Sequence, residues 1–214
     1  MLPSGYALYL NGKLVENLSL PSDLTQLQPN AFAGCASVTS ISVPPSLKTI
    51  GANAFSGCTR LRRLNLSDLD AWCAVDLGTA VLKSSGAYYL NGEPLTDLSA
   101  LVHAETIGDY AFYNCTNLVT AILPEGVTNV GDYAFANCTS LKQTSVPASV
   151  ATLGRNVFDG CGKLSVAALD GSYAALGTQL FRNCTALSDV SIPGSVTSIG
   201  TSAFNGCTGL ESVT

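Results

Sequence analysis

The 214-residue sequence is poor in charge and in long apolar runs. Asp, Glu, Lys and Arg make up 12% of it, and the formal net charge is −5. Its longest basic run is only Arg60-Leu61-Arg62-Arg63, so binding of nucleic acid through neutralised phosphates is not expected. Although 47% of the residues are hydrophobic, no stretch reaches the roughly 18 consecutive apolar residues of a membrane-spanning helix. We therefore expect neither a nucleic-acid partner nor a membrane span in these residues.

The residues that catalytic and metal sites require are also scarce. His103 is the only histidine, and a catalytic triad built on it would have to recruit Cys115 or a serine of the repeat, where serines look like surface residues. Phosphate-binding loops and His-Glu motifs are absent, and no Cys or His pair has zinc-site spacing. The acids Asp68 and Asp70 are typical of a solvated loop. The sequence thus predicts no enzyme, no catalytic residue, no metal site and no cofactor.

What the sequence has instead is a repeated pentapeptide. It consists of a small or apolar residue, Phe, any residue, Gly or Asn, and Cys. Successive copies are 23 residues apart, except for the second and third. A fixed period in the twenties is typical of solenoids, in which each coil buries its apolar face against its neighbours. The copies end at Cys35, Cys58, Cys115, Cys138, Cys161, Cys184 and Cys207.

Two further blocks complete each repeat. The first reads apolar-x-x-apolar-x-apolar-Pro, as in Val38–Pro44, and its alternating Val and Ile predict a short half-buried strand that proline ends. The second reads apolar-x-x-apolar-Gly, as in Val127–Gly131, and we expect its glycine to supply backbone freedom at a corner. Each repeat is predicted to be one coil with two or three flat sides. Strand blocks begin at residues 15, 38, 61, 95, 118, 141, 164, 187 and 210, so the last coil is incomplete.

Two near-copies of another motif interrupt the cysteine pattern. Tyr9–Gly12 and Tyr89–Gly92 both read Tyr-Leu-Asn-Gly, and Asn-Gly between apolar runs is a strong hairpin signal because both residues tolerate positive φ. We expect two β-hairpins, each beginning a block of coils. An insertion at about residues 68–88 contains Trp72 and the off-register Cys73. Its apolar character favours a buried plug, with Cys73 as part of it, over a break between two stacks.

The repeated cysteines and phenylalanines are predicted to be core. Equivalent cysteines on successive coils lie about 4.8 Å apart with parallel Cβ vectors, which suits buried free thiols better than disulfides. The phenylalanines would stack into a second buried column. An aromatic platform for sugars would require them to be exposed. They are Phe32, Phe55, Phe112, Phe135, Phe158, Phe181 and Phe204.

The quoted residues resemble those of bacterial leucine-rich repeats of the BspA-like type. The similarity lies in the Ala-Phe-x-Gly/Asn-Cys-Thr-x-Leu stretch, the Ile/Val-x-x-Pro step and the Ile-Gly corner, and it covers nearly the whole chain. An Ala-Trp-Cys segment leading to Tyr-Leu-Asn-Gly is similar to a recurrent interruption in that family. The resemblance implies a leucine-rich-repeat solenoid, mostly β with short turns or 3-10 segments, little regular α-helix, and a parallel sheet on its concave face.

We expect residues 1–214 to form one solenoid segment with coils at about 9–67 and 89–214, interrupted by the insertion. Met1 to Leu10 lacks the basic start and apolar run of a signal peptide, and the chain ends inside a strand block without a polar cap. The segment is therefore expected to belong to a longer protein. The resemblance implies that this protein is secreted or surface-anchored in host-associated bacteria or some protists and binds host proteins.

Within each strand block, the residues between the inward apolar positions point to the outer face of the sheet. The resemblance makes this concave face the expected ligand surface, with Arg62, Arg63, Asn65, Ile122 and Val166 as its anchors. The predicted ligand-binding residues are Ser40, Ser42, Arg62, Arg63, Asn65, Thr120, Ile122, Gln143, Ser145, Val166, Asp189 and Ser191.

The expected function is non-catalytic adhesion through a protein ligand, such as a host extracellular protein. Two alternatives stay open. A structural stalk is favoured by the many small hydroxyl residues, and a carbohydrate-binding module would need an exposed aromatic row on the concave face. The sequence predicts no oligomeric state.

Overall fold

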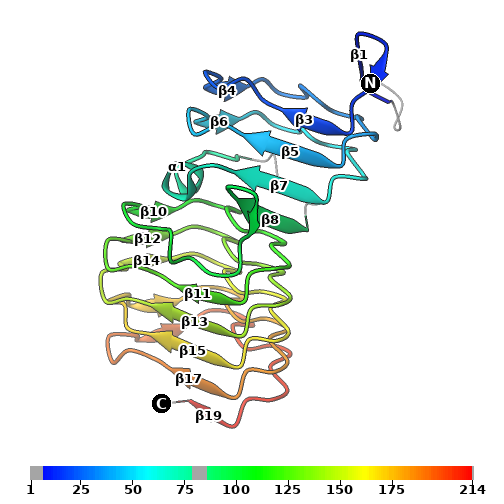
Figure 1. Cartoon of the computed structure of the whole chain (residues 1–214). Helices are drawn as coiled ribbons and strands as arrows, with labels where there is room; N and C mark the ends of the chain where they lie inside the picture. Colours follow the sequence, from blue (N-terminus) through cyan, green and yellow to red (C-terminus); the bar gives the residue numbers. More distant parts are fainter. Residues whose placement is uncertain (1–6, 79–85, 214) are drawn as a thin grey trace. The chain divides into compact units, whose positions relative to one another are not determined.

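A computed structural model describes residues 7–78 and 86–213, which form coils of a β-solenoid (Figure 1). The chain divides into two compact units, Met1–Pro94 (unit 1) and Leu95–Thr214 (unit 2). In the described residues nearly all strand pairs are parallel, and one five-residue helix is present. The predicted fold class is therefore confirmed. That residues 1–214 form a single solenoid domain stays a prediction.

Unit 1 begins with an antiparallel hairpin and continues as a five-stranded main sheet in the order β3-β5-β7-β8-β9. Its strands β3, β5, β7 and β8 are parallel, and β9 turns back against β8. A second side of the coils pairs β4 with β6. The bounds are β1 (Tyr9–Leu10), β2 (Lys13–Leu14), β3 (Asn17–Ser19), β4 (Gln26–Leu27), β5 (Ser40–Val43), β6 (Thr49–Ile50), β7 (Arg63–Leu66), β8 (Ala87–Leu90) and β9 (Glu93–Pro94).

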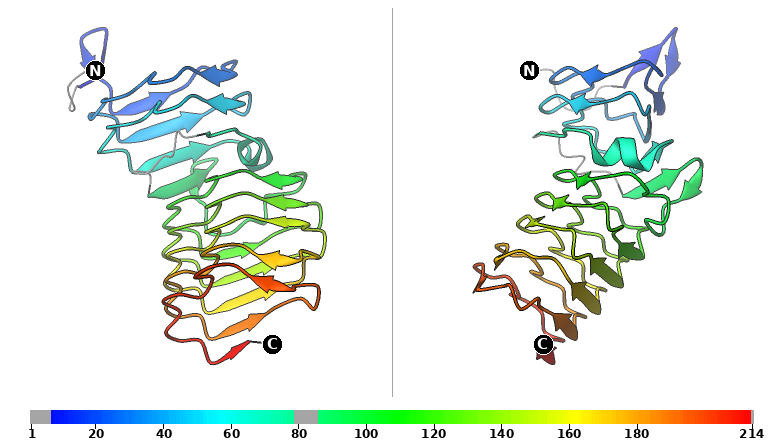
Figure 2. Two further views of the ribbon diagram at one scale, coloured as in Figure 1. Left: turned by 180° about the vertical axis from the view of Figure 1, so that it is seen from behind. Right: turned by 90° about the vertical axis from the view of Figure 1, so that its left-hand side faces the viewer.

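Unit 2 has a parallel main sheet in the order β11-β13-β15-β17-β19, and Figure 2 shows shorter strand pairs on another side of the same coils. The shorter strands form the sheets β10-β12-β14 and β16-β18. The bounds are β10 (Thr106–Ile107), β11 (Thr120–Ile122), β12 (Asn129–Val130), β13 (Gln143–Val146), β14 (Thr152–Leu153), β15 (Val166–Leu169), β16 (Ala175–Leu176), β17 (Asp189–Ser191), β18 (Ser198–Ile199) and β19 (Ser212–Val213).

The 23-residue period of the sequence is the register of the sheets. Thr120 pairs with Gln143, which pairs with Val166, which pairs with Asp189. The same offset holds in unit 1 between β3, β5 and β7. Each inward residue therefore packs on its own equivalent one coil away.

Both predicted hairpins are confirmed. Asn11 and Gly12 have φ of 50° and 75°, and Asn91 and Gly92 have φ of 51° and 91°. These left-handed values at both central residues are what a two-residue hairpin turn of type I′ requires. The first hairpin joins β1 to β2, and the second joins β8 to β9.

The phenylalanine column is buried, as predicted. Phe112, Phe135, Phe158 and Phe181 are fully buried, and their neighbouring ring centroids lie 5.3 to 5.6 Å apart with nearly parallel planes. The phenylalanines lie on a third side of the coil, outside the sheets described above. The backbone there is also hydrogen-bonded between coils: the amide N–H of Phe112 donates to Ala134 O at 2.8 Å. Towards the ends of the column, Phe32 and Phe204 are half-buried.

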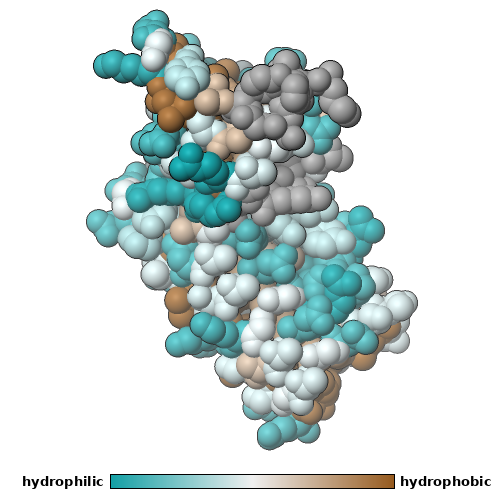
Figure 3. All heavy atoms as spheres, turned by 90° about the vertical axis from the view of Figure 1, so that its right-hand side faces the viewer, coloured by the Kyte–Doolittle hydropathy of each residue, from teal (hydrophilic) through white to brown (hydrophobic). Residues whose placement is uncertain are grey.

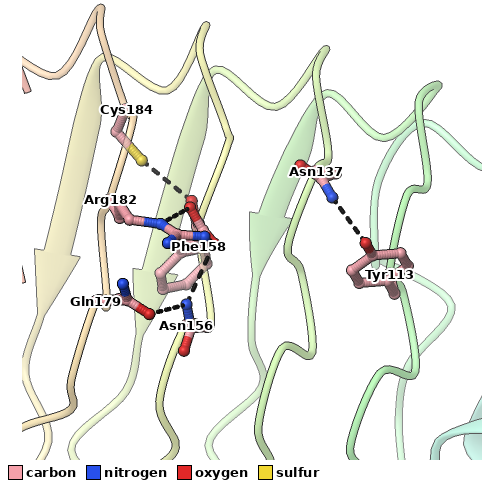
Figure 4. Close-up of polar contacts among 8 residues, drawn as sticks. Tyr113, Asn137, Asn156, Phe158, Gln179, Arg182 and Cys184 are labelled. Carbon is pink, nitrogen blue, oxygen red and sulfur yellow. Dashed lines mark hydrogen bonds and ion pairs between the residues drawn. The ribbon is translucent and has the colours of Figure 1, made fainter. Parts of the chain in front are cut away.

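All eight cysteines are free thiols. The repeat cysteines are buried as predicted, except that Cys35 and Cys207 at the ends of the column are half-buried. Cys184 Sγ donates to Phe158 O at 3.1 Å (Figure 4). Cys138 Sγ likewise donates to Phe112 O at 3.2 Å. The same bond recurs at Cys58, Cys161 and Cys207. A cysteine is therefore suited to this position both as a small apolar side chain and as a weak donor to a buried carbonyl.

The corner glycines are needed for a different reason than expected. A Cβ atom on Gly154 would lie 2.7 Å from Asp132 N and from Gly131 C, and one on Gly131 would lie 2.6 Å from Asp109 N. Neither glycine is among those with positive φ. Close approach to the backbone of the preceding coil, and not backbone freedom, excludes side chains here.

The insertion contains the predicted apolar plug. Helix α1 (Leu69–Cys73) is capped at its N-terminus by Asp68, whose carboxylate accepts the N–H of Ala71 at 2.9 Å. Leu69, Trp72 and Cys73 are buried, and β7 still pairs in parallel with β8 across the insertion. A break between stacks within the insertion is thus excluded, and the boundary between the two units follows the second hairpin. Residues 79–85 of the insertion lie outside the described residues.

Many Ser and Thr hydroxyls bond to the preceding coil, so the view of the repeat serines as mere surface residues is wrong. Ser149 Oγ donates to Val127 O at 2.7 Å, and the buried Thr144 Oγ1 donates to Ala121 O at 3.0 Å. Thr128 Oγ1 does the same to Glu105 O at 3.1 Å. These hydroxyls reinforce the backbone ladders between coils.

Candidate ligand-binding face

The candidate site is the outward face of each main sheet, defined as the strand residues that alternate with the buried ones. In unit 2 the predicted residues form two rows in register. Ile122 is 53% exposed and Val166 is 45% exposed, although both are apolar. The rows are Thr120, Gln143, Val166 and Asp189, and beside them Ile122, Ser145, Ala168 and Ser191.

The outward face of unit 1 is more polar. Its first row runs Asn17, Ser40, Arg63, Ala87, and its second runs Ser19, Ser42, Asn65, Tyr89. The expected exposure of Ser40 is wrong: Ser40 is 8% exposed, and its hydroxyl donates to Asn17 Oδ1 at 2.6 Å. Ser42, Arg63 and Asn65 are half-buried.

The two predicted arginine anchors occupy different places. Arg62 precedes β7, is exposed, and donates from Nη1 to Leu61 O at 2.9 Å. Arg63 is the first residue of β7 and belongs to the outward face. The structure therefore retains Arg63 as a sheet residue and places Arg62 on the adjoining turn.

Arg63 is held by two neighbours on the outward face. Its guanidinium carbon lies 3.4 Å from the centroid of the Tyr89 ring, and its Nε donates to Asn65 Oδ1 at 2.7 Å. The Asn65 amide in turn makes longer bonds to Ser42 Oγ at 3.3 Å and Ile41 O at 3.4 Å. Stacking of a guanidinium on an aromatic face is favourable, so the three side chains form one cluster.

Tyr89 is the member of this cluster that sequence reasoning missed. The Tyr-Leu-Asn-Gly motif places Tyr89 in the second hairpin, and the irregular length of the insertion conceals its pairing with Asn65. The sequence gives no signal for it, because Ala-Tyr-Tyr-Leu does not alternate between apolar and polar residues. The structure places Tyr89 on the outward face through its pairing with Asn65, next to Tyr88, which is 1% exposed.

A shallow depression of about 370 Å³ adjoins the cluster in unit 1. It lies where β3, β5 and β7 end and where the β8–β9 turn begins, and none of the residues that line it is charged. Asn65 lines the depression and also bonds to Arg63, so it joins the two features. Other polar residues that line the depression include Ser19, Ser42, Ser67 and Asn91.

The side of unit 2 that carries the phenylalanines has its own polar pairs between coils (Figure 4). Asn137 Nδ2 donates to Tyr113 Oη at 3.0 Å, and Asn156 Nδ2 donates to Gln179 Oε1 at 3.0 Å. Arg182 Nε donates to Asp159 Oδ1 at 2.9 Å. The members of each pair lie on neighbouring coils, and we assign them to stability.

The rest of the described surface offers few residues suited to catalysis or metal binding. One side of the molecule carries hydrophilic and near-neutral residues around small hydrophobic patches (Figure 3). His103 is exposed. Within residues 7–78 and 86–213, no three His, Cys, Asp or Glu side chains are grouped as metal ligands. Among the helices of that part of the chain, none has the length and apolarity to cross a membrane.

A family model described as the BspA type leucine rich repeat region matches residues 5–71 and 86–214 in six copies. No curated protein matches the chain. The family match covers the repeats of both units and leaves out most of the insertion.

Solved structures of bacterial leucine-rich repeat proteins share the fold. A leucine rich cell surface protein from Faecalibacterium prausnitzii A2-165 is 24% identical with a TM-score of 0.53, and the match covers 94% of this chain and 47% of that one. A leucine-rich repeat protein from Bacteroides ovatus ATCC 8483 is 24% identical with a TM-score of 0.55, covering 99% and 48%. One from Eubacterium ventriosum ATCC 27560 is 18% identical with a TM-score of 0.53, covering 94% and 72%. The chain spans about half the length of the first two.

Proposed function

This chain belongs to the BspA-type leucine-rich repeat family, and we propose that it is a non-catalytic protein-binding module, adhesive in role, of a secreted or cell-surface bacterial protein. The cell-surface location extends to this chain what is said of the Faecalibacterium protein. The partner is a protein, such as a host extracellular protein.

The observation that carries the proposal is the exposure of Ile122 and Val166 on the outward face of unit 2. The other Val, Leu and Ile residues of β11, β13, β15 and β17 are buried. Gln143 and Ser145 lie on the strand between them and offer hydrogen bonds. Asp189 pairs with Val166 on the other side. Exposed apolar anchors among polar groups are typical of a protein interface.

The stalk alternative is based on the abundance of Ser and Thr. The structure gives another reason for that abundance. Hydroxyls such as those of Ser149 and Thr128 bond to carbonyls of the preceding coil. Their number therefore follows from coil stacking and does not favour a stalk over a binding surface.

The carbohydrate alternative required an exposed aromatic row. On the described outward faces, Tyr89 is the one aromatic side chain, and Arg63 lies over its ring. A single covered ring is not a platform for successive sugars, so a protein partner is favoured.

The test is a pull-down of serum and extracellular-matrix proteins on the immobilised chain at two salt concentrations. A saturable partner should be captured, and the double variant Ile122→Ser, Val166→Ser should bind it about tenfold more weakly, as expected for interface anchors. Val102→Ser removes an apolar side chain that is 62% exposed and lies outside the strands, and it should leave binding unchanged. If no partner is captured at either salt concentration, the proposal is wrong.

A further inference from the structure

Arg63 differs from the paired arginines of the chain in having no carboxylate partner. All fifteen Asp and Glu residues lie in the described part of the chain, and none is within 4.0 Å of the Arg63 guanidinium. The carboxylate pairs of the other arginines are Arg60 with Glu16 at 4.0 Å, Arg155 with Asp132 at 2.8 Å, and Arg182 with Asp159.

The Arg63 side chain is nevertheless fixed. Stacking on Tyr89 orients the guanidinium plane, and the bond from Nε to Asn65 Oδ1 fixes its rotation. Within the described residues, the two Nη groups have no hydrogen-bond acceptor. Because an arginine usually loses much rotamer freedom on binding, a guanidinium held in advance with its Nη donors available is suited to receive a ligand.

The residues around Arg63 indicate what kind of ligand fits there. Arg63 is the one charged residue on the outward face of β3, β5, β7 and β8. A polyanion would need several cations along this face, whereas a single planar guanidinium matches one carboxylate in a bidentate pair. The depression beyond Asn65 is uncharged and mixes hydroxyls and amides with Pro44 and Pro45, which suits a peptide backbone and an apolar side chain.

We propose that Arg63 is the anchor for an Asp or Glu side chain in an extended peptide segment of the protein partner, with neighbouring residues of that segment in the depression. This inference rests on the proposed protein-binding function and adds the chemistry of the partner. Tyr89 and Asn65 are positioning residues, because they hold the guanidinium without supplying the charge.

The test begins with a random 12-residue peptide library selected on the immobilised full chain. Selected peptides should share an Asp or Glu, and replacing that residue with Asn or Gln should weaken binding about tenfold or more, since hydrogen bonds to charged groups are worth about 1.5–3 kcal/mol. Arg63→Gln should cause a similar loss and make the peptide replacement neutral, as expected when the two groups pair. Arg63→Lys should restore binding only in part.

Arg60→Ala is the matched control, because Arg60 is an exposed arginine outside the sheet, and it should bind the peptides as the wild type does. Circular dichroism melts check that each variant folds, and Tyr89→Leu gives a second route to the same loss if Arg63→Gln does not fold. Selected peptides without an acid, or peptides indifferent to both Arg63→Gln and Tyr89→Leu, would overturn the inference and leave the proposed function standing.

A heparin tetrasaccharide serves as the second probe. If it binds in an Arg63-dependent way and no peptide does, the anionic group belongs to a glycan, as a sulfate or a carboxylate, and the peptide inference is wrong. If neither peptides nor matrix and serum proteins bind, the proposed function and this inference fall together. Peptide selection with dependence on both Arg63 and the acid supports the inference.

Discussion

The rings of Trp72 and Tyr88 meet edge to face, with centroids 6.4 Å apart. Trp72 lies in helix α1 near the start of the insertion, and Tyr88 lies at its end, in strand β8, so this contact ties the insertion to the sheet. Both side chains are buried, at 2% and 1% exposed. The insertion therefore supplies core to unit 1 and is not an appended loop.

Trp72→Ala should destabilise unit 1 by about 3–5 kcal/mol, because it empties a large buried volume. Urea unfolding followed by circular dichroism measures the loss. Tyr9→Ala truncates an aromatic side chain that is 62% exposed in the same unit and should change stability little. Equal effects of the two substitutions would mean that Trp72 does not act as a plug.

Cys184→Ala should destabilise unit 2 by about 1–3 kcal/mol, because it leaves a small cavity and removes the donor to Phe158 O. Cys207 makes the same type of bond to Phe181 O but is only half-buried, so Cys207→Ala should cost less. Thermal and urea unfolding of the two variants measure this. The opposite order would contradict the ladder as a source of stability.

The buried thiols should react slowly in the native protein. Burial raises the pKa of Cys58 to about 11 and raises that of Cys184 well above its usual range, so little thiolate forms near pH 8. Iodoacetamide labelling at pH 8, followed by intact mass, should modify the half-buried Cys35 and Cys207 first. After unreduced denaturation, all eight thiols should be labelled, and a smaller number would indicate disulfides.

Alkaline pH should weaken unit 1 through Cys58. An unfolded thiol releases its proton near pH 8.5, whereas the folded Cys58 keeps its proton up to about pH 11. The folded state therefore binds the proton more tightly, and the stability it gives is present below pH 8.5 and is lost as pH rises to about 11. Urea midpoints at pH 7, 9 and 10.5 should fall less steeply in Cys58→Ala than in the wild type.

Gly154→Ala should destabilise unit 2 by about 1–3 kcal/mol, since the added Cβ would collide with the backbone of the preceding coil. Gly194→Ala is the matched control, because nothing lies within 4 Å of its added Cβ and its φ is not positive. Thermal melts compare the two. A stable Gly154→Ala variant would show that the coils can move apart there.

The sequence by itself determined everything that follows from the 23-residue period. In a coil stack each residue packs on its own equivalent, so the columns of Phe and Cys, the strand register and the outward rows of unit 2 can be counted from the chain. The two hairpins were equally predictable, because Asn-Gly favours a left-handed turn locally.

Only the tertiary structure decided features that depend on neighbours outside that period. The stack of Arg63 on Tyr89 crosses an insertion of irregular length, so no spacing rule could pair them. Ser40 has the right alternation for exposure and is buried by its hydrogen bond to Asn17 and the strands on either side. Gly154 lies at the predicted corner, but the distance between coils there, and not local backbone preference, excludes a side chain.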